Sequence, residues 1–282
     1  MRTGGHERRR RGFTCDFEGR IRQCDGGAGR VKGRLYLVGI GPGDLDQMTG
    51  RAREVLDECE VIVGYRTYLR LLSNAFPGKE FRESGMRSEI KRCEEAVRET
   101  FFGRRVALIS SGDAGVYGMA GPALEMIHDL QRDYPRSKIY LEVVPGVTAG
   151  QAAASLLGAP LMNDYAVISL SDLLTDWETI QKRLHAAALG DFVIVLINPK
   201  SKGRTEQIVE ARKIIRESRS GDVPVGLVRS ALRGESRIVI ADLDHMLDHE
   251  IDMLTTVIIG NSDTKKFGEV LVTSRGYRTE GR

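Results

Sequence analysis

The chain has 282 residues, 41% of them hydrophobic and 29% charged, with a formal net charge of +3 at pH 7. This length can bury one large core or two of about 100 to 130 residues each, and no run of 18 apolar residues predicts a membrane span. The N-terminus lacks the apolar segment of a signal peptide, so a cytoplasmic location is expected. The four cysteines form no CxxC pair and have no histidine at ligand spacing, which favours free thiols over a zinc site or a disulfide framework.

The start of the chain differs in charge from the rest. Residues 1–34 hold ten Lys and Arg and four Asp and Glu, a net charge of +6, which leaves −3 for residues 35–282. The extension at 1–33 is rich in Arg and Gly and is expected to be disordered, because burial cannot offset its ordering entropy. Its arginine run at 8–11 can contact nucleic acid, but a solvated tail is the favoured interpretation.

Beyond residue 34, short apolar runs alternate with helical patterns. The predicted strands are 35–39, 60–63, 105–110, 139–144, 166–170, 192–197, 224–228, 237–241 and 255–260. The predicted helices are 49–58, 88–101, 118–132, 148–157, 176–188 and 204–217. Continuous apolar strands separated by helices are typical of a sheet covered on both faces, so the predicted fold class is α/β.

The pattern predicts two α/β domains. A break near 145–150 separates an N-terminal domain, 34–146, from a C-terminal domain, 147–270. The first is expected to hold a parallel sheet, and the second a mixed sheet because its strands after 222 are joined by short connections. Residues 271–282 are expected to form a flexible tail, and a ligand-binding cleft is expected between the two domains.

The first glycine-rich segment, GIGPGD at 39–44, follows the first predicted strand. It lacks the third glycine of a dinucleotide fingerprint, because Asp44 stands there, and it lacks the Gly-Lys-Ser/Thr of a P-loop. Pro42 also removes an N–H donor, and Asp44 would repel a phosphate. The segment predicts either close approach of the backbone to a ligand without strong negative charge, or an ordinary helix start capped by Asp44.

Two further glycine-rich segments follow later strands. GDAGVYG at 112–118 comes after strand 105–110, at the position where open α/β sheets bind ligands. Asp113 can accept hydrogen bonds from a nucleoside there, or it can simply cap a tight turn. PGVTAGQAAAS at 145–155 places small residues after another strand, which suits close packing against a backbone or a flat ring.

In order and spacing, GIGPGD, GDAGVYG and PGVTA resemble the motifs of the tetrapyrrole methylase family, the class III S-adenosylmethionine methyltransferases. The resemblance extends from about residue 34 to 270. The family pattern has a proline in its second motif where this chain has Ala114. The resemblance implies two α/β domains, S-adenosyl-L-methionine as methyl donor, a tetrapyrrole substrate and a homodimer.

Longer segments at 61–72, 84–96, 167–204 and 252–264 resemble the family members that methylate carbon 17 of a corrin precursor in cobalamin biosynthesis. They imply precorrin-3B or its cobalt form, cobalt-precorrin-3, as the substrate, with associated ring contraction. Similar proteins that methylate another precorrin, ribosomal RNA or the diphthamide precursor are the alternatives, and the acidic body argues against RNA. A third hypothesis is a nucleotide-binding regulatory module without chemistry, which a preference for NAD or GTP would indicate.

The resemblance also assigns site residues. The implied donor-binding residues are Pro42, Gly112, Asp113, Val116, Tyr117, Thr148, Ala149, Leu170, Ile197, Asn198, Thr255 and Thr256. Asp44 is the candidate catalytic residue near the reacting ring. The implied substrate-binding residues are Gly41, Gly43, Arg87, Arg204 and Arg229, because glycines leave room for a large flat ring and guanidinium groups suit its carboxylates. No metal is expected, because a sulfonium donor arrives already activated, and neither nucleic acid nor membrane is expected as a partner.

Overall fold

The computed structural model describes residues 33–85, 88–134 and 139–276 and divides the chain into two compact units. Unit 1 runs up to Val147 and unit 2 begins at Thr148. The basic extension at 1–32 lies outside the described residues. None of the helices in the described ranges has the length and apolar character needed to span a bilayer.

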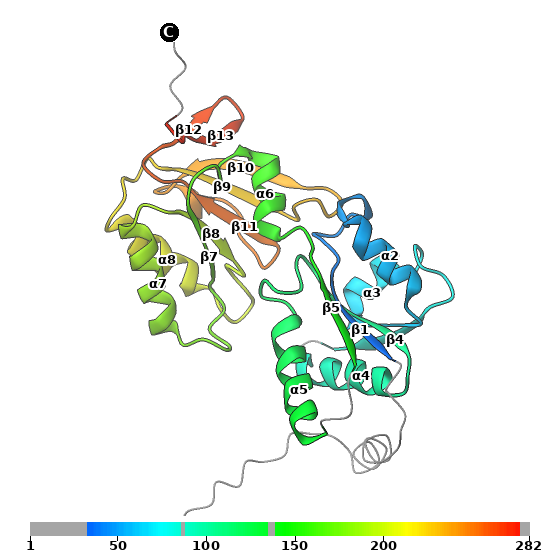
Figure 1. The fold of residues 1–282 in the computed structure, drawn as a ribbon. Coiled ribbons are helices and arrows are strands. Elements are labelled where there is room, and N and C mark those ends of the chain that lie inside the picture. The colour runs from blue at the N-terminus through cyan, green and yellow to red at the C-terminus, as the bar shows by residue number, and fades with distance from the viewer. Residues whose placement is uncertain (1–32, 86–87, 135–138, 277–282) are drawn as a thin grey trace, which may run out of the picture. The chain divides into compact units, whose positions relative to one another are not determined.

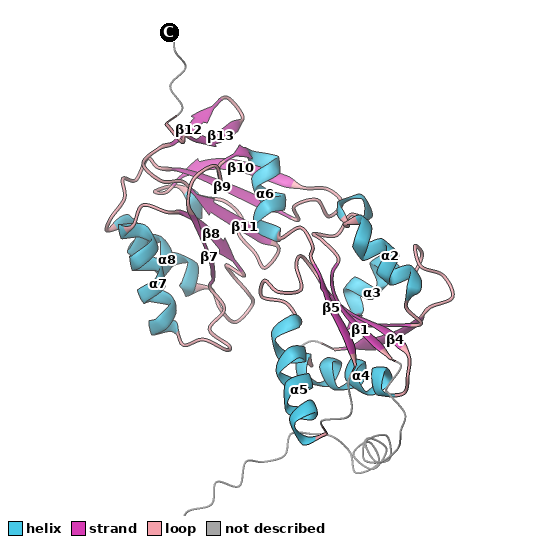
Figure 2. Ribbon diagram, viewed as in Figure 1, coloured by secondary structure: helices cyan, strands magenta, loops and turns pink. Residues whose placement is uncertain are grey.

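Unit 1 is built on a five-stranded sheet in the order β3-β2-β4-β1-β5, and every neighbouring pair in it is parallel. Figures 1 and 2 label β1, β4 and β5 of this sheet. Its strands are β1 (Arg34–Gly39), β2 (Val61–Tyr65), β3 (Glu80–Ser84), β4 (Arg105–Ser110) and β5 (Tyr140–Val144). Its helices are α2 (Gly50–Glu58), α3 (Arg66–Leu72), α4 (Glu89–Phe101) and α5 (Ala120–Asp133), and a 3-10 turn, η1 (Leu45–Gln47), precedes α2.

Helices cover both faces of this sheet, and successive side chains of a strand pack into the clusters on opposite faces. In β1, Leu35 and Leu37 pack in a cluster with α4 and α5, whereas Tyr36 and Val38 pack in a cluster with α2 and α3. The neighbours β1 and β4 therefore send the chain to opposite faces, β1 into α2 and β4 into α5. Such a switch point is where open α/β sheets have room for a ligand beyond the carboxyl ends of the strands.

Unit 2 is built on a mixed sheet in the order β10-β9-β11-β8-β7, in which β7 and β8 are parallel and the other pairs antiparallel. Its strands are β7 (Tyr165–Ser169), β8 (Val193–Ile197), β9 (Pro224–Arg229), β10 (Arg237–Asp242) and β11 (Thr255–Ile259). Its helices are α6 (Ala149–Leu157), α7 (Trp177–Leu189) and α8 (Glu206–Arg216), with a 3-10 turn, η2 (Met246–Asp248). A small second sheet holds β12 (Thr264–Phe267), β13 (Val270–Thr273) and β6 (Gly158–Ala159).

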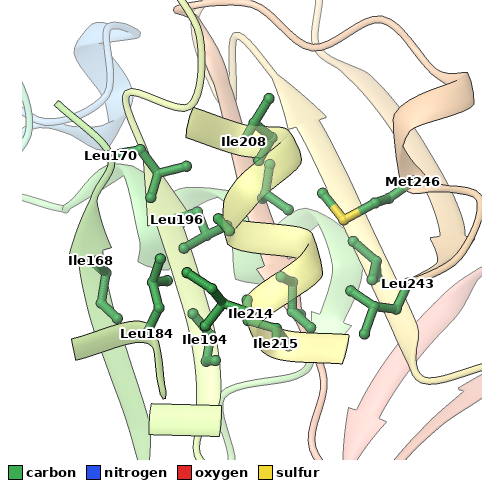
Figure 3. Packing of buried hydrophobic residues seen from close by; sticks show 14 of the residues in the cluster. Ile168, Leu170, Leu184, Ile194, Leu196, Ile208, Ile214, Ile215, Leu243 and Met246 are labelled. Atoms are coloured by element: carbon green, nitrogen blue, oxygen red, sulfur yellow. The ribbon is translucent and has the colours of Figure 1, made fainter. Parts of the chain in front are cut away.

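The main core of unit 2 lies between the mixed sheet and the helices α7 and α8. Figure 3 shows Ile194 and Leu196 of β8 packed with Leu184 of α7 and Ile214 of α8. On the opposite face, α6 lies so close to the sheet that a Cβ on Gly226 would come within 2.3 Å of Leu157. Helices thus cover both faces here too, and the α/β class is confirmed.

The sequence predicts the apolar strands and the long helices, but it misses five short elements: α3, β3, β6, β12 and β13. β3 reads EFRES and is an edge strand with a partly exposed surface, so it carries no apolar run. The flexible tail expected from residue 271 is wrong at its start, because Leu271 is fully buried in β13. There, Thr273 Oγ1 donates to the Pro160 carbonyl at 2.6 Å and lies 2.8 Å from Thr264 Oγ1.

Candidate active site

Three loops meet beyond the carboxyl ends of β1, β4 and β5 in unit 1. The first two are joined directly, because Gly41 N donates to Gly112 O at 3.0 Å and Gly112 N donates to Gly41 O at 2.7 Å. Both residues have left-handed backbones, with φ of 76° and 69°, which favour glycine. The first two glycine-rich segments of the sequence are therefore one structural feature.

Glycines also permit the loops to touch backbone to backbone. A Cβ on Gly39 would lie 2.7 Å from Gly112 O and 2.8 Å from Gly146 N. A Cβ on Gly146 would lie only 2.2 Å from Gly112 O. We call Gly39, Gly112 and Gly146 the glycine junction; it joins all three motifs, and neither Gly39 nor Gly146 has room for a Cβ.

Asp113 links the second and third loops through its carboxylate. Its Oδ1 accepts from Gly115 N at 2.7 Å, and its Oδ2 accepts from Gly146 N at 2.9 Å, 33 positions along the chain. Both oxygens therefore hold main-chain N–H groups. This accounts for an Asp in the loop without any ligand, although each oxygen keeps further acceptor capacity.

Asp44 does not cap a helix through its side chain. It precedes the 3-10 turn η1, but its carboxylate makes no capping hydrogen bond there. Helix α2 is capped instead by Thr49, whose Oγ1 accepts from Ala52 N at 3.2 Å. Asp44 is exposed, and helix capping by its side chain, one of the two roles that the sequence leaves open, is not what the structure shows.

The loop after β4 presents two large side chains to solvent. Val116 is 44% exposed and Tyr117 is 61% exposed. Tyr117 also has a left-handed backbone with φ of 53°, which is costly for a residue with a bulky side chain. The base of the loop is fixed by Ser110, whose Oγ accepts from Met119 N at 2.9 Å. A strained aromatic residue on a fixed loop is a frequent feature of ligand sites.

The third motif continues into unit 2 at the start of α6. Thr148 forms a reciprocal capping box with Gln151, in which Thr148 Oγ1 accepts from Gln151 N and Gln151 Oε1 accepts from Thr148 N, each at 3.2 Å. Helix capping thus accounts for Thr148 without a ligand. Ala149, the first residue of the helix, is exposed.

The predicted site residues at the strand ends of unit 2 share one edge of its sheet. The parallel strands β7 and β8 end there, at Ser169 and Ile197, and the antiparallel β11 begins there. Thr255 is the register partner of Arg229, the last residue of β9. The residues at this edge are Leu170, Ile197, Asn198, Arg229, Thr255 and Thr256, and we call it the site edge of unit 2.

Several of these residues are buried or hydrogen-bonded within unit 2. Leu170 points into the core (Figure 3) and is fully buried, while its N–H donates to Ile197 O at 3.0 Å. Asn198 has a left-handed backbone with φ of 50° and donates from Nδ2 to Ser169 Oγ at 3.0 Å. Thr256 is also buried. These residues shape the edge, and the structure leaves few of their polar groups for a ligand.

Asp252, which is not among the predicted site residues, accepts hydrogen bonds from two of them. Its Oδ2 accepts from Arg229 Nε at 2.7 Å, and its Oδ1 accepts from Thr255 Oγ1 at 3.0 Å and from Leu254 N at 2.9 Å. Burial by itself would raise the pKa of the Asp252 carboxyl, but these hydrogen bonds outweigh it and hold the pKa below its ordinary value. The spacing of Asp252 and Thr255 in DMLT is the sequence signal that could have indicated this turn.

Acid should weaken this edge of unit 2. A carboxyl with a lowered folded-state pKa contributes stability above its unfolded pKa of about 3.9, and the contribution is lost as the pH falls through the lower, folded value. Urea unfolding followed by the single tryptophan, Trp177, should therefore show a steeper loss of stability below pH 4 in the wild type than in Asp252→Asn. Equal pH dependence of the two proteins would contradict the assigned role of Asp252.

Arg204 lies inside unit 2. It is 7% exposed, its Nη1 donates to the Leu170 carbonyl at 2.8 Å, and its Nε lies 3.9 Å from Asp172 Oδ1. Burial lowers the pKa of the guanidinium, and Asp172 opposes that shift. Its visible role is to hold the chain just after β7. Arg87, the other favoured substrate-binding arginine, lies outside the described residues.

Comparison with known proteins identifies the family of the chain. The family model for tetrapyrrole (corrin/porphyrin) methylases matches residues 34–247, which include all three glycine-rich motifs. The chain belongs to this family. It is therefore a methyltransferase, in agreement with the resemblance of its motifs.

Two similar proteins carry the names of specific methyltransferases. The chain is 45% identical to a probable cobalt-factor III C(17)-methyltransferase of Salmonella typhimurium, over 86% of this chain and 99% of that protein. It is 48% identical to the cobalt-factor III methyltransferase of Priestia megaterium over 88% of this chain, but it spans only 46% of that longer protein.

Solved structures agree in fold. The crystal structure of the methyltransferase CobJ matches with a TM-score of 0.78 and 33% identity, over 86% of this chain and all of that one. The uroporphyrin-III C-methyl transferase of Thermus thermophilus, complexed with S-adenyl homocysteine, matches with a TM-score of 0.62 and 26% identity, over 81% of this chain and 97% of that one.

Proposed function

We propose that this protein transfers a methyl group from S-adenosyl-L-methionine to carbon 17 of cobalt-factor III or of precorrin-3B in cobalamin biosynthesis, with associated contraction of the ring. The observation that carries the proposal is the match to the Salmonella relative along nearly the full length of that protein. The convergence of the three glycine motifs at the switch point of unit 1 supports it, because that is where such a sheet has room for a ligand.

The residues of unit 1 fit this donor better than they fit a nucleotide with phosphates. Carboxylates, Asp44 and Asp113, stand in the loops after β1 and β4, and they would repel a pyrophosphate but not a donor that carries a positive sulfonium. When bound, S-adenosyl-L-methionine supplies an already activated methyl group. The protein's task is then to orient two reactants and to exclude water.

We propose distinct roles for the donor-binding residues of unit 1. Val116 and Tyr117 provide exposed contact surface for the donor, and Asp113 holds the loop that presents them. Pro42 and Gly112 are buried and form the framework of the loops. The donor-binding residues proposed in unit 2 are Thr148, Ala149, Leu170, Ile197, Asn198, Thr255 and Thr256; Leu170 can act only through its main chain, because its side chain is in the core.

For the macrocycle, we propose that Asp44 lies near the reacting ring and that Gly41 and Gly43 leave room for it. Arg229 would contribute positive charge toward the carboxylates of the substrate, although its guanidinium already forms an ion pair with Asp252. Arg204 would act through the loop it holds. We further propose that two copies form a homodimer in the cytoplasm, as the family resemblance implies, and sedimentation of the purified protein tests the dimer.

Transfer of label from methyl-tritiated S-adenosyl-L-methionine tests the proposal. Cobalt-factor III and precorrin-3B should accept label, whereas uroporphyrinogen III and ribosomal RNA should remain close to background. Labelling of another precorrin would retain the family and change the substrate. Labelling of RNA alone, with no tetrapyrrole product, would overturn the proposal.

A further inference from the structure

The loop between β7 and α7 presents two adjacent leucines to solvent. We call residues 170–176 the β7–α7 loop; it reads LSDLLTD. Leu173 is 68% exposed and Leu174 is fully exposed, while Leu170 at the base of the same loop is fully buried. Two adjacent exposed leucines at the tip of an otherwise polar loop can bury apolar surface against an apolar ligand.

The first half of this loop is held in place. The Leu170 carbonyl accepts from Arg204 Nη1 at 2.8 Å, and Asp172 Oδ2 accepts from Gln207 Nε2 at 2.9 Å. Arg204 Nε also lies 3.9 Å from Asp172 Oδ1. Arg204 is 7% exposed and follows β8, so the loop is fixed to the interior of the unit. Gln207 Oε1, in contrast, is buried without a hydrogen-bond partner among the described residues.

The second half is held by the start of helix α7. Asp176 caps the helix, with Oδ1 accepting from Thr179 N at 2.7 Å and Oδ2 accepting from Thr179 Oγ1 at 3.0 Å. Trp177 next to it packs against the main core. With both ends fixed, the tip can present its leucines without the entropic cost of ordering a free loop.

The tip leaves the sheet at the site edge of unit 2. Met253 and Leu254, which precede β11 at the same edge, are also 47% and 46% exposed. The edge therefore combines exposed apolar side chains with the guanidinium of Arg229. A flat tetrapyrrole has apolar ring faces and a rim of carboxylates, and this combination complements both.

We infer that Leu173 and Leu174 contact the apolar face of the tetrapyrrole macrocycle, and that Arg204 and Gln207 are positioning residues that hold the leucines for it. This inference rests on the proposed function and adds the residues that determine affinity for the macrocycle. Two leucines flanked by Asp172 and Asp176 cannot by themselves form a stable subunit interface, which buries roughly 800 Å² per partner, so the homodimer proposed above does not depend on them.

The double variant Leu173→Ser/Leu174→Ser tests the inference, with Leu189→Ser as the matched control. Leu189 is 80% exposed at the opposite end of α7. Titration of cobalt-factor III, followed by its own visible absorption, should show roughly 10- to 100-fold weaker binding in the double variant and no change in the control. Calorimetric affinity for S-adenosyl-L-methionine should stay within about twofold of wild type in both.

The positioning role has its own readout. Arg204→Met should weaken binding of the macrocycle more than binding of the donor, because the donor contacts Leu170 alone in this loop whereas the macrocycle contacts its tip. Arg204→Lys should restore part of the loss, because an ammonium can still donate to the Leu170 carbonyl. Circular dichroism checks that both variants fold. If Arg204→Met lost donor and macrocycle affinity equally, the assigned positioning role would be wrong.

Other outcomes separate this inference from the proposed function. If the wild type binds and methylates the macrocycle but the double variant binds it equally well, the inference fails and the function stands. If the double variant changes the sedimentation of the protein instead, the leucines belong to a subunit contact and the inference also fails. If the wild type neither binds nor methylates the macrocycle, the proposed function fails and the inference falls with it.

Discussion

Gly146→Ala should be among the most destabilising single substitutions in unit 1. The new Cβ would lie 2.2 Å from Gly112 O and 2.8 Å from Gly39 C, and both are main-chain atoms that cannot rotate away. The three loops of the glycine junction would have to separate. We expect a loss of about 3 kcal/mol in the free energy of unfolding, and a fall of roughly 10 °C in Tm, by far-UV circular dichroism.

Gly121→Ala is the matched control for this substitution. Gly121 lies in the first turn of α5, after the loop from β4, and a Cβ there would meet nothing within 4 Å. Alanine should leave stability unchanged or raise it by up to about 1 kcal/mol, because it favours a helix more than glycine does. If both variants unfolded at the wild-type temperature, the close backbone contact at Gly146 would be contradicted.

Asp113→Ala should reduce both stability and donor affinity. The substitution removes two charge-assisted hydrogen bonds, one to Gly115 N and one to Gly146 N. We expect a loss of about 2 to 3 kcal/mol in stability, and roughly 10- to 100-fold weaker binding of S-adenosyl-L-methionine by calorimetry. From sequence alone the same change would be expected to spare the fold; the carboxylate's bridge between two loops is the reason to expect otherwise.

Two other variants show whether the bridge is responsible. Asp113→Asn keeps the shape of the side chain but has only one oxygen, so it should retain part of the stability and part of the donor affinity. Asp129→Ala, on the exposed surface of α5 where Asp129 pairs with Arg132, should change neither quantity by more than a few tenths of a kcal/mol or twofold. Unchanged donor affinity in Asp113→Ala would remove Asp113 from the donor site.

Much of the fold could be predicted because its strands are short apolar runs. Strands such as VIVLI in β8 are buried on both faces and carry a continuous apolar signal, which is typical of sheets covered by helices. The short elements gave no such signal. α3 has seven residues, and β12 reads TKKF with mostly exposed side chains, so pairing partners far along the chain decide their structure.

The candidate site could be predicted only as positions, not as contacts. Loops after parallel strands are expected to meet at one edge, and the three glycine motifs do so in unit 1. The bridge from Asp113 to Gly146 and the burial of Arg204 depend on the packing of segments more than 30 residues apart. A sequence pattern depends only on neighbours along the chain. It therefore predicts that Arg204 binds the substrate, whereas its side chain is buried inside the unit.

The glycine-rich loop at Asp44 differs from a phosphate-binding loop. The loop keeps the glycines that bring backbones together, at Gly39 and Gly41, but places a carboxylate where a dinucleotide site has a third glycine. The Asp44 carboxylate makes no capping hydrogen bond to η1, and Thr49 caps α2. A cationic donor with an uncharged ribose is compatible with it, whereas a pyrophosphate is not.

Incubation with cobalt-factor III and S-adenosyl-L-methionine carrying a ¹³C-methyl group tests the central claim most directly. Mass spectrometry counts the methyl groups gained, and NMR assigns the labelled carbon. The account predicts a gain of one labelled methyl group, attached to carbon 17 of the macrocycle. A tetrapyrrole recovered without label, or labelled at a different carbon, from protein that binds the donor normally would contradict it.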